Sequence, residues 1–444
     1  MLRPSRLATF GGIAIVGVLA ALALHASVSD ASTSELPAMT LSPGAANASD
    51  RMIIGVGIHR RTKHFDPARS DALTRQLGFT SIRDELGQSA SSVRGGLDRT
   101  LAKGGALSSP ARSANDANVF AVTGGGSGQF PNGIPLTDKE RQSFYRFLTQ
   151  LGPRMQSRPF IEIWNEWNLS GRLREAGSPE SYAMLVDGAV PVLRKAFPGS
   201  KILAGSIGND FDSGLGGTTY WNWTRTYLES GSWKKADGLS VHLYANCMKG
   251  INRQPIALIR RLRDLDGIIR DNNGGRSFPV YLTEVGWSGR RGSCGFDAHE
   301  RAAFPAQFLI MAEALPFLRG VWLYELQDGQ GDPRDTENSY GLVDARYRVK
   351  PETCPTRQAI ALLRSYRVSG VKIVGGIATA ALQSGSRKIE MAWSADGAAH
   401  QKSLQPGQQA RALCAPRSTG NAPLRLTILP HVIYTGEAPR ELTR

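Results

Sequence analysis

The stretch Phe160-Ile161-Glu162-Ile163-Trp164-Asn165-Glu166-Trp167-Asn168 determines how the rest of the chain is interpreted. It begins as an apolar, β-branched run after Pro159 and ends in an amide and a carboxylate that lie between two indoles. This pattern predicts a short buried strand ending at a rim. There the polar groups of Asn165 and Glu166 can meet a ligand instead of being buried without a partner.

A second stretch, Val280-Tyr281-Leu282-Thr283-Glu284-Val285-Gly286-Trp287, has the same character. It is a short apolar run with one carboxylate, Glu284, and a tryptophan three residues later. Hydrolysis of a bond between two sugars needs two carboxyl groups, one to protonate the leaving oxygen and one to attack the sugar or activate water. Two glutamates at strand ends therefore indicate that chemistry.

Between residues 51 and 367, apolar runs alternate with helical patterns, which predicts an α/β fold. The strands are expected at 52–58, 79–82, 117–123, 160–166, 201–205, 238–243, 280–286 and 320–324. The helices are expected at 67–77, 90–104, 138–151, 179–197, 218–229, 256–269, 302–318 and 351–366. Apolar strands without alternation indicate a parallel sheet covered on its outside, and eight such units can close into a (β/α)₈ TIM barrel.

The two ends of the chain have a different texture. Residues 368–444 contain short alternating runs between Gly, Ser and Asn turns, which predicts a small antiparallel β domain resembling a sandwich. Residues 32–50 are rich in Ser, Ala and Pro and are expected to form a linker.

The first 31 residues are typical of an export signal. Arg3 and Arg6 precede an apolar run from Leu7 to Leu24, and a small-x-small cleavage site follows at 29–31. This predicts a protein of the periplasm or a secreted protein. Because the run approaches the length of a membrane span, an uncleaved inner-membrane anchor facing the periplasm is the alternative.

Four cysteines in an exported chain favour disulfides. Cys247 follows the sixth predicted strand and Cys294 the seventh, so the pair Cys247–Cys294 is expected on one face of the barrel. The pair Cys354–Cys414 would tie the barrel to the C-terminal domain. The alternative is four unpaired cysteines that pack as small hydrophobic side chains.

The formal charge of +15 allows an acidic polysaccharide or an anionic membrane surface as a partner, but a solvated basic surface is the favoured interpretation. An exported chain without a basic tract interleaved with aromatic residues is not expected to bind nucleic acid.

Trp164-Asn165-Glu166 resembles the acid/base signature of the clan A glycoside hydrolases, and Thr283-Glu284 resembles their nucleophile strand. With Asn168, the match is most similar to family 39 and its bacterial exopolysaccharide-processing relatives. The family usually has proline where this chain has Trp167. The resemblance implies a closed eight-stranded barrel with a C-terminal β module, a polysaccharide or oligosaccharide substrate, no cofactor and a monomer.

The resemblance also assigns roles to the two glutamates. Glu166 would be the general acid/base and Glu284 the nucleophile of a retaining, double-displacement mechanism, with carboxyl groups roughly 5–5.5 Å apart. Repulsion from the second carboxylate is expected to raise the pKa of Glu166 and keep it protonated.

Other candidates lie at the same strand ends and are expected to bind substrate or to orient the glutamates. They are His59, Arg83, Asn165, His242, Tyr244 and Trp322. By resemblance, Asn165 would bond the sugar 2-hydroxyl, Arg83 and Tyr244 the nucleophile, and Trp322 would form the floor under the reacting sugar. Alternatives remain open: Arg83 as a buried partner of Glu162, His242 as a hydrogen-bonded core residue, and Trp322 as barrel packing.

Two other classes of function are compatible with such a barrel. One is a carbohydrate-binding protein without turnover, for which Trp167 is the single supporting feature. The other is a metal-dependent hydrolase, which needs a His-x-His pair or clustered ligands at strand ends, whereas the histidines here are scattered. We therefore expect no metal.

Overall fold

The computed structural model describes residues 36–43, 51–59, 65–87, 118–123, 130–154, 158–170, 177–210, 221–420 and 423–443. The expected export segment at 1–31 and the helix expected at 90–104 lie outside these ranges. Within these ranges, no helix combines the length and the apolar character that crossing a bilayer requires.

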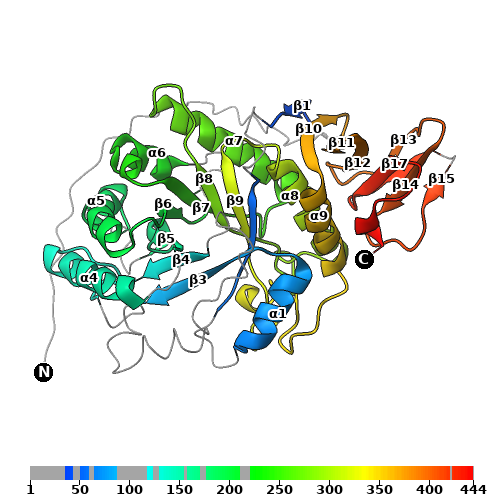
Figure 1. Ribbon diagram of the computed structural model, residues 1–444. Coiled ribbons are helices and arrows are strands. Elements are labelled where there is room, and N and C mark those ends of the chain that lie inside the picture. Colours follow the sequence, from blue (N-terminus) through cyan, green and yellow to red (C-terminus); the bar gives the residue numbers. More distant parts are fainter. Residues whose placement is uncertain are drawn as a thin grey trace, which may run out of the picture. The chain divides into compact units, whose positions relative to one another are not determined.

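Parallel strands close into a barrel in which each strand pairs with the next along the chain and the last pairs with the first (Figure 1). The strands are β2 (Ile53–Gly57), β3 (Ser81–Gly87), β4 (Val119–Thr123), β5 (Phe160–Ile163), β6 (Ile202–Ile207), β7 (Gly238–Tyr244), β8 (Val280–Gly286) and β9 (Leu318–Leu323). Every residue of β2, β4, β5, β6 and β8 is buried, as expected for a parallel sheet covered by helices. The predicted eight-stranded barrel is confirmed.

Helices surround the barrel (Figure 1). They are α1 (Pro67–Leu77), α4 (Asp138–Leu151), α5 (Pro179–Ala196), α6 (Asn222–Glu229), α7 (Pro255–Asp271), α8 (Ala298–Ala312) and α9 (Thr353–Ser365). Local sequence sets several of their ends. The side chain of Asp66 caps α1, and Gly78 ends it in the left-handed conformation at φ +94°. A capping box between Thr137 and Glu140 starts α4.

One layer of large side chains fills the barrel near the N-terminal ends of its strands. Its members are Ile53, Val119, Phe160, Leu203, Tyr281 and Trp322. Trp322 stands opposite Gly55, and its ring occupies the space left by two glycines. A Cβ added at Gly55 would lie 2.2 Å from the ring and one at Gly320 would lie 2.5 Å from it. The interior is therefore packed with side chains and closed at this end.

The C-terminal part forms a seven-stranded antiparallel sheet in the order β1-β10-β11-β12-β17-β14-β15. Its strands are β1 (Met39–Leu41), β10 (Arg367–Val374), β11 (Ile377–Ser384), β12 (Arg387–Ser394), β14 (Gln408–Ala412), β15 (Thr419–Gly420) and β17 (His431–Thr435). A two-stranded ribbon of β13 (His400–Lys402) and β16 (Leu424–Leu426) packs on it through Leu424 and Leu426. The module is thus antiparallel, as predicted, with one large sheet and a small second layer.

The prediction of a linker at 32–50 is wrong for residues Met39–Leu41. These residues form β1, which pairs with β10 from Met39 opposite Ile373 to Leu41 opposite Val371. Met39 and Leu41 are buried and Thr40 is exposed, which is the alternation of an edge strand with one covered face. The strand has only three residues and lies between Ser- and Pro-rich segments, so the sequence shows no sign of it.

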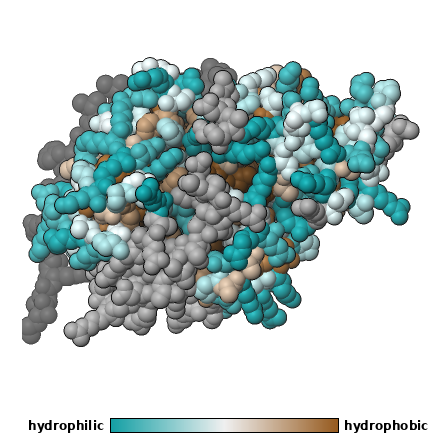
Figure 2. Space-filling model, viewed as in Figure 1, coloured by the Kyte–Doolittle hydropathy of each residue, from teal (hydrophilic) through white to brown (hydrophobic). Residues whose placement is uncertain are grey.

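The barrel and the C-terminal sheet are joined by polar bonds and a disulfide. Gln358 on α9 donates to the carbonyl of Leu442 at 3.1 Å and accepts from the amide of Cys414 at 2.7 Å. Disulfides link Cys354 to Cys414 and Cys247 to Cys294. The face drawn in Figure 2 is largely hydrophilic, with hydrophobic residues in small areas between polar ones.

Candidate active site

The turn after β5 presents Asn165 and Glu166 to the interior of the barrel. Trp164 and Glu166 both adopt left-handed backbone conformations, at φ +73° and +47°. Such conformations are uncommon for non-glycine residues and persist where the surroundings fix them. Here the hydroxyl of Ser170 donates to the carbonyls of Asn165 and Glu166 at 3.1 and 2.8 Å.

Trp167 anchors the same turn. Its side chain is fully buried and packs edge-on against Trp164, with ring centroids 5.3 Å apart. Its indole nitrogen donates to the hydroxyl of Ser181 at 3.1 Å. Trp167 is therefore part of the support of the turn.

A bulge in β8 explains how two consecutive residues both face the site. Val241 on β7 pairs with Leu282, but the next residue, His242, pairs with Glu284, so Thr283 is the extra residue. The hydroxyl of Thr283 donates to Glu162 at 2.7 Å, while Glu284 reaches the opening of the barrel. Without the bulge, consecutive side chains of a strand would point to opposite faces.

Arg83, on β3, connects Glu162 with two of the predicted site residues, Glu284 and Asn165. Its Nε donates to Glu162 at 2.8 Å and its Nη1 to Glu284 at 2.6 Å. Its Nη2 donates to the side-chain oxygen of Asn165 at 2.7 Å. The two roles considered for Arg83, partner of Glu162 and partner of the second glutamate, are thus both fulfilled by one guanidinium with its several fixed donors.

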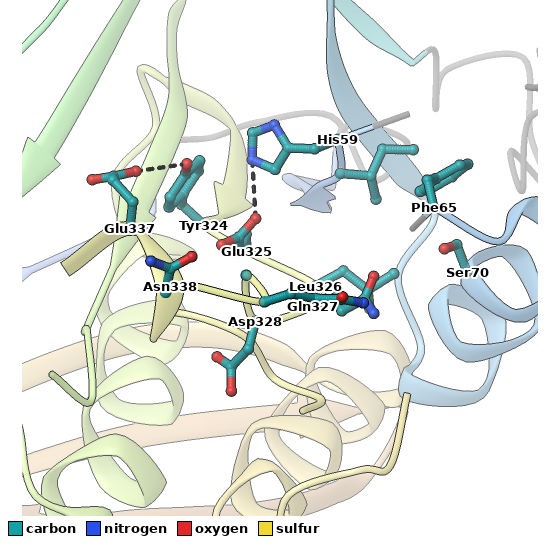
Figure 3. A pocket seen from close by; sticks show the side chains of 13 residues that line it. His59, Phe65, Ser70, Tyr324, Glu325, Leu326, Gln327, Asp328, Glu337 and Asn338 are labelled. Atoms are coloured by element: carbon teal, nitrogen blue, oxygen red, sulfur yellow. Dashed lines mark hydrogen bonds and ion pairs between the residues drawn. The ribbon is translucent and has the colours of Figure 1, made fainter. Parts of the chain in front are cut away.

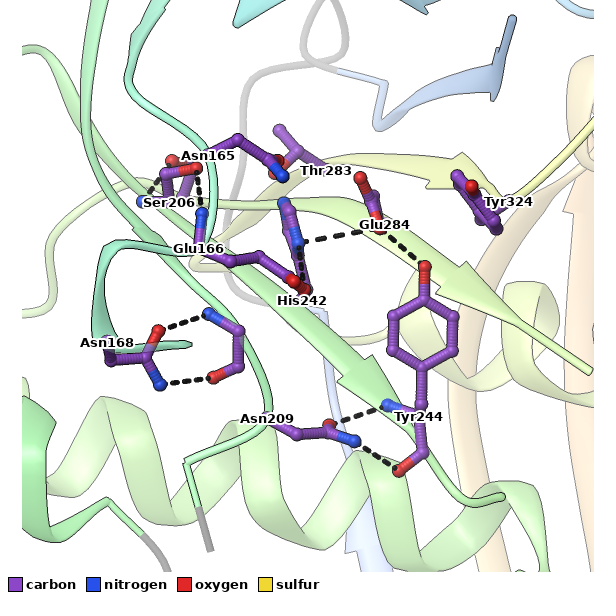
Figure 4. A network of polar contacts seen from close by, with 12 residues as sticks. Asn165, Glu166, Asn168, Ser206, Asn209, His242, Tyr244, Thr283, Glu284 and Tyr324 are labelled. Carbon is purple, nitrogen blue, oxygen red and sulfur yellow. Dashed lines mark hydrogen bonds and ion pairs between the residues drawn. The ribbon is translucent and has the colours of Figure 1, made fainter. Parts of the chain in front are cut away.

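Glu284 is held by two donors. Besides Arg83, the hydroxyl of Tyr244 donates to its Oε2 at 2.5 Å. The side chain of Glu284 is 9% exposed and that of Glu166 is 28% exposed. Glu284 is therefore fixed in a pocket of donors, and Glu166 is the more accessible of the two carboxylates (Figure 4).

His242 lies between the two glutamates. Its Nδ1 is 2.9 Å from Oε1 of Glu166 and 3.5 Å from Oε2 of Glu284, and its side chain is fully buried. Nδ1 and one oxygen of each carboxylate all lie within 4.8 Å of one another. The two carboxyl groups therefore face each other across a short gap beside the imidazole of His242.

The charges of this cluster are strongly coupled. Burial would lower the pKa of His242, but the adjacent carboxylates of Glu284, Glu162 and Glu166 raise it to about 10. Burial would raise the pKa of Glu162, but Arg83 and His242 lower it to about 2. The inner part of the site thus holds an ionised Glu162, a protonated imidazole and a guanidinium.

The expectation that Glu166 has a raised pKa is wrong for the free protein. Burial acts in that direction, but the hydrogen bond and the charge of His242, with the charge of Arg83, outweigh it and lower the pKa of Glu166. The sequence predicts repulsion between the carboxylates of Glu166 and Glu284, but it does not show that the imidazole of His242 lies between them. In the free site the proton is held on His242, next to the oxygen of Glu166.

Trp322 does not form a floor for a sugar. It is fully buried in the layer at the far end of the barrel, and its indole nitrogen donates to the hydroxyl of Ser81 at 3.0 Å. Tyr324, two residues later in the chain, lies at the mouth instead. Its ring centroid is 6.1 Å from that of Tyr244. The position of Tyr324 one full alternation beyond Trp322 was the signal in the sequence that could have identified it.

His59 lies apart from the glutamates. Its Nε2 forms an ion pair with Glu325 at 2.9 Å, and its ring meets that of Tyr324 edge-on at 5.5 Å. Burial would lower the pKa of His59, but Glu325 raises it to about 9. His59 therefore belongs to a neighbouring cavity and not to the cluster around Glu284.

Two asparagines that were not among the candidates fix the loops of the site. The side chain of Asn209 accepts from the amide of Tyr244 at 2.8 Å and donates to its carbonyl at 3.3 Å. Asn168 makes the same pair of bonds with Gly208, at 2.8 and 3.2 Å. Each amide imitates a backbone strand partner, so the loops after β5, β6 and β7 are held together (Figure 4).

In the part of the chain that the structure describes, the residues whose spacing could suit a metal ion are Glu166, His242 and Glu284. Their surroundings do not fit one. Glu284 already accepts from Arg83 and Tyr244, and a guanidinium nitrogen of Arg83 lies 3.4 Å from Nε2 of His242. A cation would be placed against a fixed positive charge, whereas a shared proton suits the 2.9 Å contact.

The fold and the facing carboxylates define a closed (β/α)₈ barrel with a polar site at the C-terminal ends of its strands. Solved structures share this fold. A family 39 glycoside hydrolase from the gut symbiont Bacteroides cellulosilyticus WH2 matches with a TM-score of 0.62 and 19% identity, over 87% of this chain and 81% of that one. A monomeric beta-xylosidase from Caulobacter crescentus CB15 matches with a TM-score of 0.55 and 15% identity, over 88% of this chain and 97% of that one.

A GH30 endoxylanase from Clostridium papyrosolvens C71 also matches, with a TM-score of 0.54 and 10% identity, over 89% of this chain and the whole of that one. No protein-family model matches the sequence, and a search of curated proteins found no similar one. The likeness to glycoside hydrolases is therefore a likeness of fold at low sequence identity.

Proposed function

We propose that the protein is a retaining glycoside hydrolase that cleaves O-glycosidic bonds of a polysaccharide or oligosaccharide. The observation that carries this proposal is the pair Glu166 and Glu284, which face each other with one oxygen of each carboxylate within 4.8 Å of the other. Retaining enzymes have carboxyl groups about 5–5.5 Å apart, while inverting enzymes need about 6.5–9.5 Å to admit a water molecule.

In the first step, an oxygen of Glu284 attacks the anomeric carbon while the bond to the leaving sugar oxygen breaks. The proton on Glu166 passes to that oxygen, and the sugar becomes an ester of Glu284. In the second step, Glu166 takes a proton from water, the water oxygen attacks the anomeric carbon, and Glu284 is released as a carboxylate. Asn165 lies where it can bond the sugar during both steps.

Arg83 and Tyr244 keep Glu284 ionised and pointed at the sugar, because each donates a hydrogen bond to a different oxygen. His242 supplies the proton that Glu166 needs. When a sugar displaces water from the site, charge separation between Glu166 and His242 becomes less favourable, and the proton moves over the 2.9 Å contact to the carboxylate.

The test is hydrolysis of a glycan panel that includes β-xylosides, xylan and bacterial exopolysaccharides, with the anomer of the first product followed by NMR. Retention of configuration is expected. Glu284→Gln should lower kcat by about 10⁴-fold or more, because the nucleophile is lost, and Glu166→Gln by about 10²–10⁴-fold. Glu390→Gln, the same change on strand β12 of the C-terminal sheet, is the control and should leave kcat unchanged. An inverted product would refute double displacement.

A carbohydrate-binding barrel without turnover is the second candidate, and Trp167 was the feature in its favour. The structure gives Trp167 a supporting position in the turn that carries Glu166. Binding of a glycan that the protein leaves intact over the whole panel would favour this candidate, and a catalytic effect of Glu284→Gln would exclude it.

We further propose that the protein works outside the cytoplasm, in the periplasm or secreted, or held at the inner membrane by its first residues. The apolar run from Leu7 to Leu24 after two arginines supports export. The two disulfides are consistent with an oxidising compartment. Mass spectrometry of the protein from a periplasmic extract would distinguish a chain cleaved near residue 31 from an intact one.

A further inference from the structure

A cavity of about 400 Å³ opens beside the two glutamates. It is formed by the chain after β2, the first turns of α1 and the segment after β9 (Figure 3). Tyr324 separates it from Glu284, since the ring of Tyr324 neighbours that of Tyr244, whose hydroxyl donates to Glu284. A volume of this size is typical of small-ligand sites and accommodates a sugar unit.

The charged groups that line the cavity are Glu325, Asp328, Glu337 and His59. Two of the three carboxylates have a cationic partner. Glu325 is paired with His59 at 2.9 Å, and Asp328 with Lys350 at 2.8 Å. The negative charge of these two is therefore largely neutralised.

Glu337, the third carboxylate of the lining, differs in its partners. Its carboxylate accepts a hydrogen bond from the hydroxyl of Tyr324 at 2.9 Å, and none of the cationic groups in the described ranges forms an ion pair with it. Partial burial raises the pKa of Glu337, and the negative charges of Glu284, Glu166 and Asp335 raise it further. A positive charge placed in the cavity would relieve this repulsion.

The rest of the lining suits a sugar. Ile58, Phe65 and Leu326 provide an apolar wall for the C–H face of a ring. Ser70, near Phe65 in Figure 3, is 1% exposed, so its hydroxyl lies behind the surface of the cavity. The lining therefore combines an apolar wall with the carboxylate of Glu337.

We propose that this cavity binds a sugar unit that carries a protonated amino group, with the carboxylate of Glu337 as the acceptor for that ammonium. The proposal rests on the proposed function and names its substrate class, a glycan that contains hexosamine with a free amine. The hydroxyl of Tyr324 holds the carboxylate of Glu337 at the edge of the cavity by its 2.9 Å hydrogen bond.

The same charges disfavour a uronic acid. Its carboxylate would approach Glu337 and Glu284 without a free cation in the described lining to offset the repulsion. The net charge of +15 suggests an acidic polymer if it is considered alone, but the local charge at the site has the opposite sign. Local charge, not net charge, determines which sugar a cavity accepts.

Binding to the Glu284→Gln variant by titration calorimetry tests the proposal without turnover. The probes are four tetramers of β-1,4-linked sugars: glucosamine, N-acetylglucosamine, glucose and glucuronate. We expect the glucosamine tetramer to bind at least about fivefold more tightly than the glucose tetramer at low salt, and the glucuronate tetramer to bind least well. Added salt should reduce the preference for glucosamine.

A second substitution, Glu337→Gln, should abolish this preference and leave the affinity for the glucose tetramer within about twofold. Asp332→Asn is the matched control, since it removes a negative charge from the same segment at an exposed position outside the cavity. It should retain the preference. Equal binding of the glucosamine and glucose tetramers before the substitution, or a preference that survives Glu337→Gln, would overturn the proposal.

The outcome separates this proposal from the function on which it rests. Glu337-dependent binding of the glucosamine tetramer by a protein that cleaves no glycan would support the cavity and refute the hydrolase. Retaining hydrolysis of neutral glycans without any dependence on Glu337 would support the hydrolase and refute the binding of an amino sugar in the cavity.

Discussion

Nε of Arg83 donates to Glu162 at 2.8 Å inside the barrel, where neither side chain is more than 3% exposed. Glu162 thereby occupies Nε of the guanidinium, and the structure shows one nitrogen donating to Glu284 and the other to Asn165. Without Glu162, Arg83 could turn and bind Glu284 with two donors, which would stabilise the proposed nucleophile too strongly for attack. Glu162 is thus a positioning residue, and its effects can be measured.

Glu162→Ala should lower the free energy of unfolding by about 3–5 kcal/mol, because it removes one partner of a buried ion pair. Glu162→Gln should cost less, since the amide still accepts from Arg83. Its kcat should fall while KM changes little, and the acidic limb of kcat/KM should move to lower pH. Thr283→Val, which removes only one hydrogen bond to Glu162, is the control and should cost about 1 kcal/mol.

The pH dependence of stability follows from opposite shifts at Glu162 and His242. The pKa of Glu162 is lowered to about 2, so its contribution is complete above its ordinary pKa of 4.5 and is lost as the pH falls from there toward 2. The pKa of His242 is raised to about 10, so its contribution is complete below 6.5 and is lost as the pH rises toward 10. Urea titrations should therefore show a maximum between pH 4.5 and 6.5 from these two groups.

In His242→Gln the loss of stability above pH 6.5 should be smaller than in the unsubstituted protein, because the residue that titrates is gone. An identical alkaline slope in both proteins would contradict the assignment of the proton to His242.

Activity should depend on the same imidazole. With His242 in place, Glu166 can draw on a proton held up to about pH 10. In His242→Gln, Glu166 must keep its own proton, so the alkaline limb of kcat/KM should shift to lower pH by at least about one unit. His59→Gln changes a histidine that does not contact either catalytic glutamate and should leave this limb in place. A limb that stays at the same pH in His242→Gln would refute the proton supply.

Trp322 and Tyr324 should respond to substitution in opposite ways. Trp322→Ala removes a fully buried ring and should lower the free energy of unfolding by about 3–5 kcal/mol. The folded protein that remains in Trp322→Ala should show the same pH dependence of kcat/KM as the unsubstituted protein. Tyr324→Ala should cost less stability and should raise KM, because the ring lines the cavity next to the site. Chemical denaturation and kinetics on the same preparations decide between these outcomes.

The two disulfides should also differ in their effects. Cys354→Ser with Cys414→Ser opens a link between residues 60 positions apart and should lower the free energy of unfolding by about 2–4 kcal/mol, with kcat/KM retained below the unfolding transition. Cys247→Ser with Cys294→Ser loosens the loops after β7 and β8, where Tyr244 and Glu284 lie, and should also lower kcat/KM. A wholly unchanged kcat/KM would show that these loops need no covalent link.

Much of the architecture could be predicted from the sequence, because buried parallel strands have a plain local signature. Apolar residues delimit the strands at Phe160–Ile163 and Val280–Gly286, and cap residues delimit helix α1. Glu166, Glu284, Arg83 and Tyr244 could be placed together because the C-terminal ends of parallel strands meet at one edge.

What could not be predicted depends on contacts between distant residues. Whether Trp322 or Tyr324 reaches the mouth is decided by the empty space at Gly55 and Gly320, on two different strands. The lowered pKa of Glu166 depends on how near His242 comes. The strand Met39–Leu41 is too short to show a period, and its partner lies more than 300 residues later in the chain.

That pairing has a consequence for how the protein is made. Met39–Leu41 is synthesised more than 300 residues before the edge that it completes, Val371–Ile373. Until then β1 has nothing to dock on, and afterwards it covers an edge that would otherwise be open to other chains. Strand β1 can therefore join the sheet only after β10 has been made, and a variant that lacks Met39–Leu41 should self-associate through the open edge of β10.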